Sequence, residues 1–101
     1  MKVIVETPQF DADVKLISFI EKKLSKLEQF YDRIIQAEVF LKLEPNNKPD
    51  NKISEVLIRV PGDKFIVKKV AKSFEEGVDV CAQSLERVLK KHKEKIRAHA
   101  S

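Results

Sequence analysis

Apolar side chains recur at steps of three and four residues through the end of the chain, from Ser73 to Ala98. Steps of this size place side chains on one stripe of an α-helix. Ser73 and Glu76 form a capping box, in which the hydroxyl and the carboxylate each accept a hydrogen bond from a backbone N–H. The stripe consists of Phe74, Val78, Cys81, Leu85, Val88, Leu89 and Ile96. The pattern predicts a long C-terminal helix that covers the rest of the protein.

A second helical stripe lies in the first third of the chain. Asp13 stands directly before it and is suited to cap the helix. Ahead of it, Val3–Glu6 predicts a short strand that ends at Thr7 and Pro8, because proline cannot continue the hydrogen bonds of a strand. The apolar positions of this second stripe are Leu16, Ile17, Ile20, Leu24, Leu27 and Tyr31.

Between the two helices, apolar and polar residues alternate, which is typical of strands with one buried face. The clearest alternation runs from Ile35 to Glu44, and further strands are predicted at Ile53–Val60 and Phe65–Val70, the last interrupted by two lysines. The polar loop Pro45–Asn51 and the turn Pro61–Asp63 separate them. In the first of these strands the predicted buried side chains are Ile35, Ala37, Val39, Leu41 and Leu43.

The predicted order is strand, helix, strand, strand, strand, helix, or β-α-β-β-β-α. This order predicts an α+β two-layer sandwich, with two helices on one face of a four-stranded antiparallel sheet. The other face carries both apolar and basic side chains, and a contiguous apolar patch there would be a partner surface or a platform for stacked bases. These residues are Ile4, Phe40, Leu57, Ile66, Lys42, Arg59 and Lys68.

Composition favours one small domain. The chain has 101 residues, of which 43% are hydrophobic, enough for a single core. Its only cysteine, Cys81, cannot form an internal disulfide. The apolar run at Val3–Val5 is too short for a signal peptide or a membrane span, so we expect a cytoplasmic protein without a membrane partner. Two glycines are too few for a glycine-rich phosphate loop.

No catalytic constellation is visible in the sequence. His92 and His99 have no cysteine or carboxylate at metal-ligand spacing. Asp11 and Asp13 are better explained as helix caps than as a paired acid and base. We therefore expect no enzymatic activity, no metal or cofactor and no small-molecule substrate.

The positive charge is concentrated in the second half of the C-terminal helix. From Leu85 onward, six bases stand against Glu86 and Glu94, and this surplus of four equals the net charge of +4 of the whole chain. A solvated helix end that complements the helix dipole accounts for part of it. Two acids cannot pair six bases, which favours a surface for phosphates. The six bases are Arg87, Lys90, Lys91, Lys93, Lys95 and Arg97.

Charge is also segregated on the first helix. Lysines occupy one flank, and Glu21 and Glu28 fall on the opposite flank. Ion pairs within a helix need opposite charges three or four residues apart. Lys22 and Lys26 have this spacing but carry the same charge. Chance in a lysine-rich chain remains an alternative to a phosphate-binding flank. The lysines concerned are Lys15, Lys22 and Lys26, with Lys23 beside them.

Three runs carry a family resemblance: residues 24–34 (LSKLEQFYDRI), 39–44 (VFLKLE) and 84–95 (SLERVLKKHKEK). Together they resemble the short ribosome hibernation-promoting factors, also known as ribosome-associated inhibitors. The resemblance implies a fold similar to double-stranded-RNA-binding domains. It also implies binding to ribosomal RNA of the small ribosomal subunit in the mRNA and tRNA channel, inhibition of translation, and preservation of idle ribosomes in stationary phase.

Carried over by position, the resemblance implies one set of RNA-binding side chains on both helices. These are Lys22, Lys23, Lys26, Arg87, Lys90, Lys91, Lys93 and Lys95. Where many members have Asp-Met-Tyr, this chain has Ser73-Phe74-Glu75, and it departs from common family residues at Ser84 and Val88. Lys68 or Lys69 would compensate for these departures by binding RNA in their place.

The resemblance further implies that residues 1–101 form a single ribosome-binding domain without the C-terminal dimerisation domain of long members. Pairing of ribosomes would then need a separate ribosome-dimerising factor. Two other functions stay open at this point. One is a generic double-stranded-RNA-binding protein, and the other is a protein-interaction module that uses the open face of the sheet.

Overall fold

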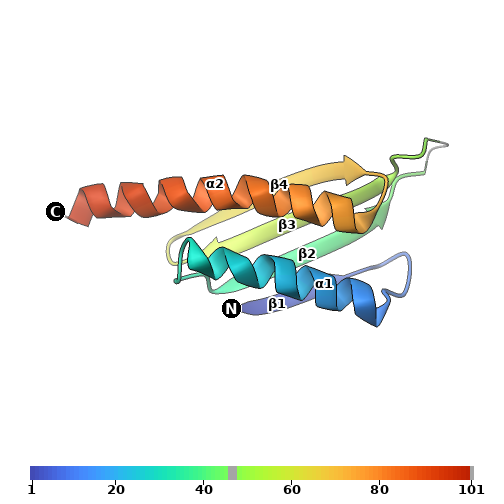
Figure 1. Cartoon of the computed structure of the whole chain (residues 1–101), viewed down its shortest axis with the longest axis horizontal. Helices are drawn as coiled ribbons and strands as arrows, with labels where there is room; N and C mark the ends of the chain where they lie inside the picture. The colour runs from blue at the N-terminus through green and yellow to red at the C-terminus, as the bar shows by residue number, and fades with distance from the viewer. Residues whose placement is uncertain (46–47, 101) are drawn as a thin grey trace.

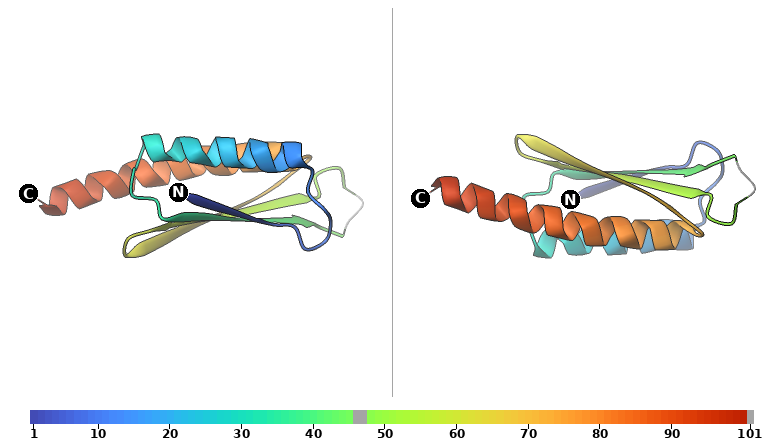
Figure 2. Two further views of the ribbon diagram at one scale, coloured as in Figure 1. Left: turned by 90° about the horizontal axis from the view of Figure 1, so that it is seen from below. Right: turned by 90° about the horizontal axis from the view of Figure 1, so that it is seen from above.

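The computed structural model describes residues 1–45 and 48–100 of the chain and forms two layers (Figure 1). The sheet has the strand order β1-β2-β3-β4, and both helices cover the same face of it (Figure 2). The predicted two-layer α+β sandwich is confirmed, while residues 46 and 47 of the predicted loop lie outside the described residues. The elements are β1 (Lys2–Glu6), α1 (Val14–Ser25), the 3-10 helix η1 (Lys26–Gln29), β2 (Gln36–Leu43), β3 (Lys52–Val60), β4 (Asp63–Ala71) and α2 (Phe74–Ala100).

The sheet is mixed, so the prediction of a wholly antiparallel sheet is wrong. β1 runs parallel to β2, with Val3 opposite Ala37 and Val5 opposite Val39. β2, β3 and β4 are antiparallel to their neighbours. Parallel neighbours need a crossover rather than a tight turn, and α1 with η1 provides it by returning the chain to the end of the sheet where β1 began.

One core fills the space between the helices and the sheet. Val39 and Leu41 of β2 are fully buried, as the alternation predicted. The same prediction is wrong at the ends of this run, where Ile35 is 56% exposed and Leu43 is 36% exposed. Ile35 precedes β2, and Leu43 is the last residue of the strand. The fully buried larger side chains are Ile20, Leu24, Val39, Leu41, Val56, Ile58, Val78, Cys81, Leu85 and Leu89.

The starts of both helices have the predicted caps at Asp13 and Ser73, although the second bond of the predicted capping box, accepted by the Glu76 carboxylate, is not among the bonds of the described residues. The Lys15 backbone N–H donates to Oδ1 of Asp13 at 2.9 Å, and the Glu76 backbone N–H donates to Oγ of Ser73 at 3.1 Å. These bonds satisfy N–H groups that have no partner inside the helix. The N-terminal stripe continues through η1, so that Tyr31 remains buried beyond the end of α1.

α2 is longer than the surface that it covers. Its C-terminal end extends beyond the sheet and beyond α1 (Figure 1). Ile96, which the sequence pattern placed on the buried stripe, is therefore 39% exposed, and that prediction is wrong. None of the helices formed by the described residues is long and apolar enough to span a membrane.

The N-terminal part of α2 packs against β3 at unusually short range. A Cβ atom built on Gly77 would lie 2.6 Å from Oγ of Ser54 and 3.1 Å from its Cβ. Ser54 is fully buried on the helix-facing side of β3. The absence of a side chain at Gly77 therefore sets how closely this helix approaches the sheet.

The open face of the sheet is a mixture of apolar and charged side chains. Ile4, Leu57 and Ile66 lie in one cross-strand row, and Glu38 separates Ile4 from Leu57. Phe40 lies in the next row, between Glu6 and Glu55 of the neighbouring strands. Acidic side chains thus interrupt the apolar positions on which a partner surface or a stacking platform would depend.

Candidate nucleic-acid interface

One lysine of α1, Lys23, contacts α2. Nζ of Lys23 lies 2.8 Å from Oδ1 of Asp79, which joins the two helices by an ion pair, and 5.8 Å from the centre of the Phe19 ring. On the opposite flank, Glu28 lies 3.6 Å from the amino group of Met1. Lys23 therefore lies beside the second helix, and Glu28 of η1 lies beside the amino group that precedes β1.

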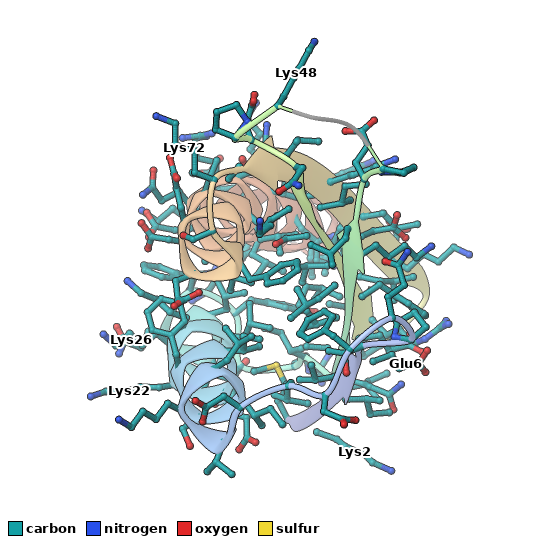
Figure 3. All side chains as sticks on the ribbon, turned by 90° about the vertical axis from the view of Figure 1, so that its right-hand side faces the viewer. Lys2, Glu6, Lys22, Lys26, Lys48 and Lys72 are labelled. Atoms are coloured by element: carbon teal, nitrogen blue, oxygen red, sulfur yellow. The ribbon has the colours of Figure 1, made fainter. Side chains whose placement is uncertain are left out.

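Lys22 and Lys26 are exposed and point away from the sheet on the helix side of the molecule (Figure 3). Among the described residues, neither has an acidic group within 4 Å, so both ammonium groups are available to an external anion. With Phe19 and Lys23 they line a hollow of about 200 Å³.

A groove of about 190 Å³ runs between the helices below these lysines. It has mixed charge, because Lys23 and Lys26 of the first helix face Asp79 and Glu86 of the second. Lys23 is paired with Asp79, whereas Lys26 forms no ion pair among the described residues. Lys26 is therefore better placed than Lys23 to bind phosphate. The remaining lining residues are Leu27, Gln29, Phe30, Ala82 and Gln83.

One group of α2 bases lies on the flank of the helix that faces η1. Nζ of Lys90 lies 3.1 Å from Oε2 of Glu86 and 4.8 Å from the centre of the Phe30 ring. Lys93 and Arg97 lie along the same flank and, with Phe30, line a notch of about 280 Å³. Arg87 is exposed, and its Nη2 donates to Oγ of Ser84 at 3.4 Å.

Lys91 and Lys95 occupy the other flank of α2. Together with Asp63 and Phe65 they line a hollow of about 230 Å³ beside the β3–β4 turn. His92 closes this side of the core, with its ring edge-on to Phe65 at 5.2 Å. Bases at such close sequence positions cannot share one face at about 100° per residue. The predicted α2 bases therefore surround the end of the helix rather than form a single ridge with α1.

Lys68 and Lys69 lie apart from the helix bases. Lys68 lies opposite Glu55 on the open face of the sheet, because successive residues of a strand point to opposite faces. Lys69 lies opposite Ser54 on the helix-facing side and is half-buried. The structure thus brings Lys22, Lys23 and Lys26 together at one hollow and Lys90 and Lys93 together at another. The two β4 lysines line neither of these hollows.

Cys81 lies inside the core rather than at this surface. Burial raises the pKa of its thiol to about 11, while the positive charge of Lys69 acts in the opposite direction. Its Sγ is 3.7 Å from the carbonyl oxygen of Ser54. The thiol therefore stays protonated at neutral pH. Across residues 1–45 and 48–98, no group of three or more histidine, cysteine or acidic side chains is placed to hold a metal ion.

Two residues at this surface were missing from the set of RNA-binding side chains that the family resemblance implied, although Arg97 was counted among the bases of the C-terminal helix. Arg97 lies one helical turn beyond Lys93 and completes the notch that Phe30 lines. The spacing of four residues was a signal for Arg97. Phe30 gave no comparable signal, because its contact with Lys90 joins positions sixty residues apart.

The fold and its surface define a class: a small α+β sandwich whose helix layer presents unpaired cations. The model of the family described as "Sigma 54 modulation protein / S30EA ribosomal protein" matches residues 3–97. The chain belongs to this family. A ribosome hibernation promoting factor of Azotobacter vinelandii is 33% identical over 95 residues, which cover 94% of this chain and 85% of that protein. The family resemblance inferred from the sequence is confirmed.

Solved structures show the same fold. A ribosomal subunit interface protein from Coxiella burnetii superposes with a TM-score of 0.81 at 21% identity, covering 93% of this chain and 99% of that chain. The N-terminal domain of Protein Y from Thermus thermophilus gives a TM-score of 0.77 at 20% identity, covering 91% and 99%. At this level of identity the likeness concerns the fold alone.

Proposed function

We propose that this protein is a ribosome hibernation factor that binds ribosomal RNA of the small subunit through the helix layer, occupies the channel for mRNA and tRNA, and inhibits translation. One observation carries the proposal. Among the described residues, several helix cations that reach solvent have no acidic group within 4 Å, although the chain has 16 acidic residues. These cations are Lys22, Lys26, Lys91, Lys93 and Lys95. Family membership and the hibernation factor of Azotobacter vinelandii support this choice among anionic partners.

The proposed mechanism is steric exclusion guided by charge. Lysine and arginine contacts to phosphates release counterions, which supplies affinity that falls with salt. Specificity comes from the shape of the RNA site, because the deep groove of A-form RNA shows side chains little of its sequence. If about six phosphates are neutralised, a plot of log affinity against log salt concentration has a slope of about −4 to −5. This role needs no catalysis and no cofactor.

A pair of matched variants tests the contact surface. The first replaces Lys90, Lys91 and Lys93 of α2 with glutamate, and the second replaces Lys2, Lys42 and Lys64 on the sheet side. Each change of lysine to glutamate alters the charge by −2, so both variants go from +4 to −2. We expect the helix variant to lose co-sedimentation with small ribosomal subunits and the sheet variant to keep most of it.

Circular dichroism melts of both variants check that the fold survives the substitutions. Equal loss in the two variants would show that net charge, rather than the helix layer, decides binding. Unchanged co-sedimentation of the helix variant would show that α2 is not the contact surface. Competition between small subunits and plain duplex RNA then separates a ribosome-specific factor from a generic double-stranded-RNA binder.

Within this proposal, residues 1–101 act as one ribosome-binding domain in the cytoplasm. The site residues on both helices remain predictions. Lys68 and Lys69 have a weaker claim to RNA contact, because they lie on opposite faces of β4 and away from the α2 bases. A protein-interaction role for the open sheet face has less support, since acidic side chains divide its apolar residues.

A further inference from the structure

Phe30 lies between two neighbouring hollows of the helix layer and lines both of them. These hollows are the groove between α1 and α2 and the notch that Lys93 and Arg97 complete. The residue is half-buried and packs against the core, and its backbone N–H donates to the carbonyl oxygen of Leu27 at 3.0 Å. The ring is therefore held in place while part of it faces solvent.

The surroundings of the ring carry excess positive charge. Lys90, Lys93 and Arg97 line the notch together with one acid, Glu94. Among the described residues, Lys93 and Arg97 form no ion pair. A fixed aromatic ring beside unpaired cations is the combination with which proteins bind single-stranded nucleic acid, the ring for a base and the cations for the phosphates.

Lys90 of α2 lies over the ring of Phe30. Its ammonium group lies 4.8 Å from the centre of the Phe30 ring, in a cation–π contact. The same ammonium group is 3.1 Å from Oε2 of Glu86, one turn earlier in α2. Because Glu86 remains as a partner, Lys90 can leave the ring to a base without becoming an isolated charge.

We propose that the notch binds an unpaired nucleotide of the target RNA, with its base stacked on Phe30 and its phosphate on Lys93 and Arg97. This inference rests on the proposed function. It adds that the protein recognises an unpaired nucleotide as well as the shape of the RNA duplex. A base inside a regular duplex is stacked between its neighbours, so only a bulged, looped or single-stranded nucleotide can reach the ring. The notch would then favour folded ribosomal RNA over plain duplex RNA.

Fluorescence provides a direct test, because the chain contains no tryptophan. In Phe30→Trp the indole is a single reporter at the notch. We expect a single-stranded RNA oligonucleotide to quench its fluorescence and a blunt duplex of the same length to leave it unchanged. Phe40→Trp is the matched control. Phe40 is also half-buried with a lysine over its ring, Lys42 at 5.8 Å, but it lies on the open sheet face, and we expect no quenching there.

Affinity measurements complete the test. We expect Phe30→Leu to weaken binding to the single strand and to small ribosomal subunits by about 5- to 150-fold, the range for loss of one stacked base. Binding to the blunt duplex should not change. Phe30→Tyr, which keeps a stacking ring, should bind as the wild type does and excludes a mere loss of folding. Phe40→Leu should leave all three affinities unaltered.

The outcomes separate this inference from the function on which it rests. If Phe30→Leu binds small subunits like the wild type while reversal of Lys90, Lys91 and Lys93 abolishes binding, the nucleotide site is wrong and the proposed function stands. If duplex RNA quenches the Phe30→Trp indole as strongly as the single strand does, the notch does not select unpaired nucleotides. If the lysine reversal also leaves small-subunit binding intact, the proposed function itself fails.

Discussion

The two parts of α2 have the same secondary structure and opposite surroundings. Residues 74–89, here the docked segment, contain every fully buried side chain of α2 up to Ala98 and rest on β3 and β4. Residues 90–98, here the outer segment, have Ile96 as their only large aliphatic side chain, and it is 39% exposed. The outer segment carries Lys90, Lys91, Lys93, Lys95 and Arg97 against one acid, Glu94.

This difference between buried apolar residues and exposed bases explains why the helix is longer than the sheet beneath it. A charged group loses its hydration when it is buried, so bases cannot occupy the positions that pack on the core. The docked segment uses its apolar residues to hold the helix. In the outer segment His92 still packs edge-on against Tyr31 and Phe65, and the residues after it continue the same hydrogen-bonding pattern into solvent. Propagation of a helix costs far less than its nucleation, so the docked segment also maintains the outer one.

The largest expected effect comes from removing side-chain bulk from each of the two segments. Leu85→Ala empties a fully buried position of the docked segment and should lower the free energy of unfolding by about 2–5 kcal/mol. Ile96→Ala should cost less than about 1 kcal/mol, because the side chain is partly in water already. Urea denaturation followed by circular dichroism measures both. A similar loss in the two variants would mean that the outer segment is packed like the docked one.

An intermediate effect should come from the close contact at Gly77. In Gly77→Ala the new Cβ would lie 2.6 Å from Oγ of Ser54, and overpacking of this kind costs about 1–3 kcal/mol. At an open helix position the same change would gain about 1 kcal/mol, so a net loss reports the contact itself. Denaturant melts of the single and double variants provide the measurement.

Ser54→Ala is the control for that contact. It removes the hydroxyl but leaves its own Cβ, which lies 3.1 Å from the position of the new one. The double variant Ser54→Ala with Gly77→Ala should therefore recover part of the loss and not all of it. A Gly77→Ala protein more stable than the wild type would show that α2 has room to move away from β3.

The smallest effect concerns the ion pair that ties α1 to the docked segment. Lys23→Met removes the contact with Asp79, and the loss of unfolding free energy should be about 0.2–1 kcal/mol. The two side chains are 34% and 39% exposed, so water and salt screen the pair. Thermal melts at low and at about 1 M salt measure the difference, which should shrink at high salt.

Lys22→Met is the matched control, because Lys22 has no ion pair among the described residues. It should leave stability nearly unchanged at either salt concentration. If the Lys22 and Lys23 variants lose the same amount, the contact with Asp79 adds nothing beyond the general effect of charge. Packing alone would then hold α1 against the docked segment.

Local patterns in the sequence predicted much of the fold correctly. The stripes, the caps at Asp13 and Ser73 and the order of elements depend on residues within a few positions of each other, and all appear in the structure. The errors at Ile35, Leu43 and Ile96 have a common cause. Periodicity shows which face of an element is apolar, but it does not show how far along that element another layer extends.

The candidate site also combines features that follow from the local sequence with features that follow only from tertiary packing. The chain by itself determined that α1 has a lysine flank and that the end of α2 is basic, because helical period converts spacing into direction. Only the tertiary structure decided that β1 runs parallel to β2, that Lys23 meets Asp79, and that Phe30 lies beside Lys90. These contacts join residues far apart in the chain, and they depend on how the layers pack rather than on any local preference.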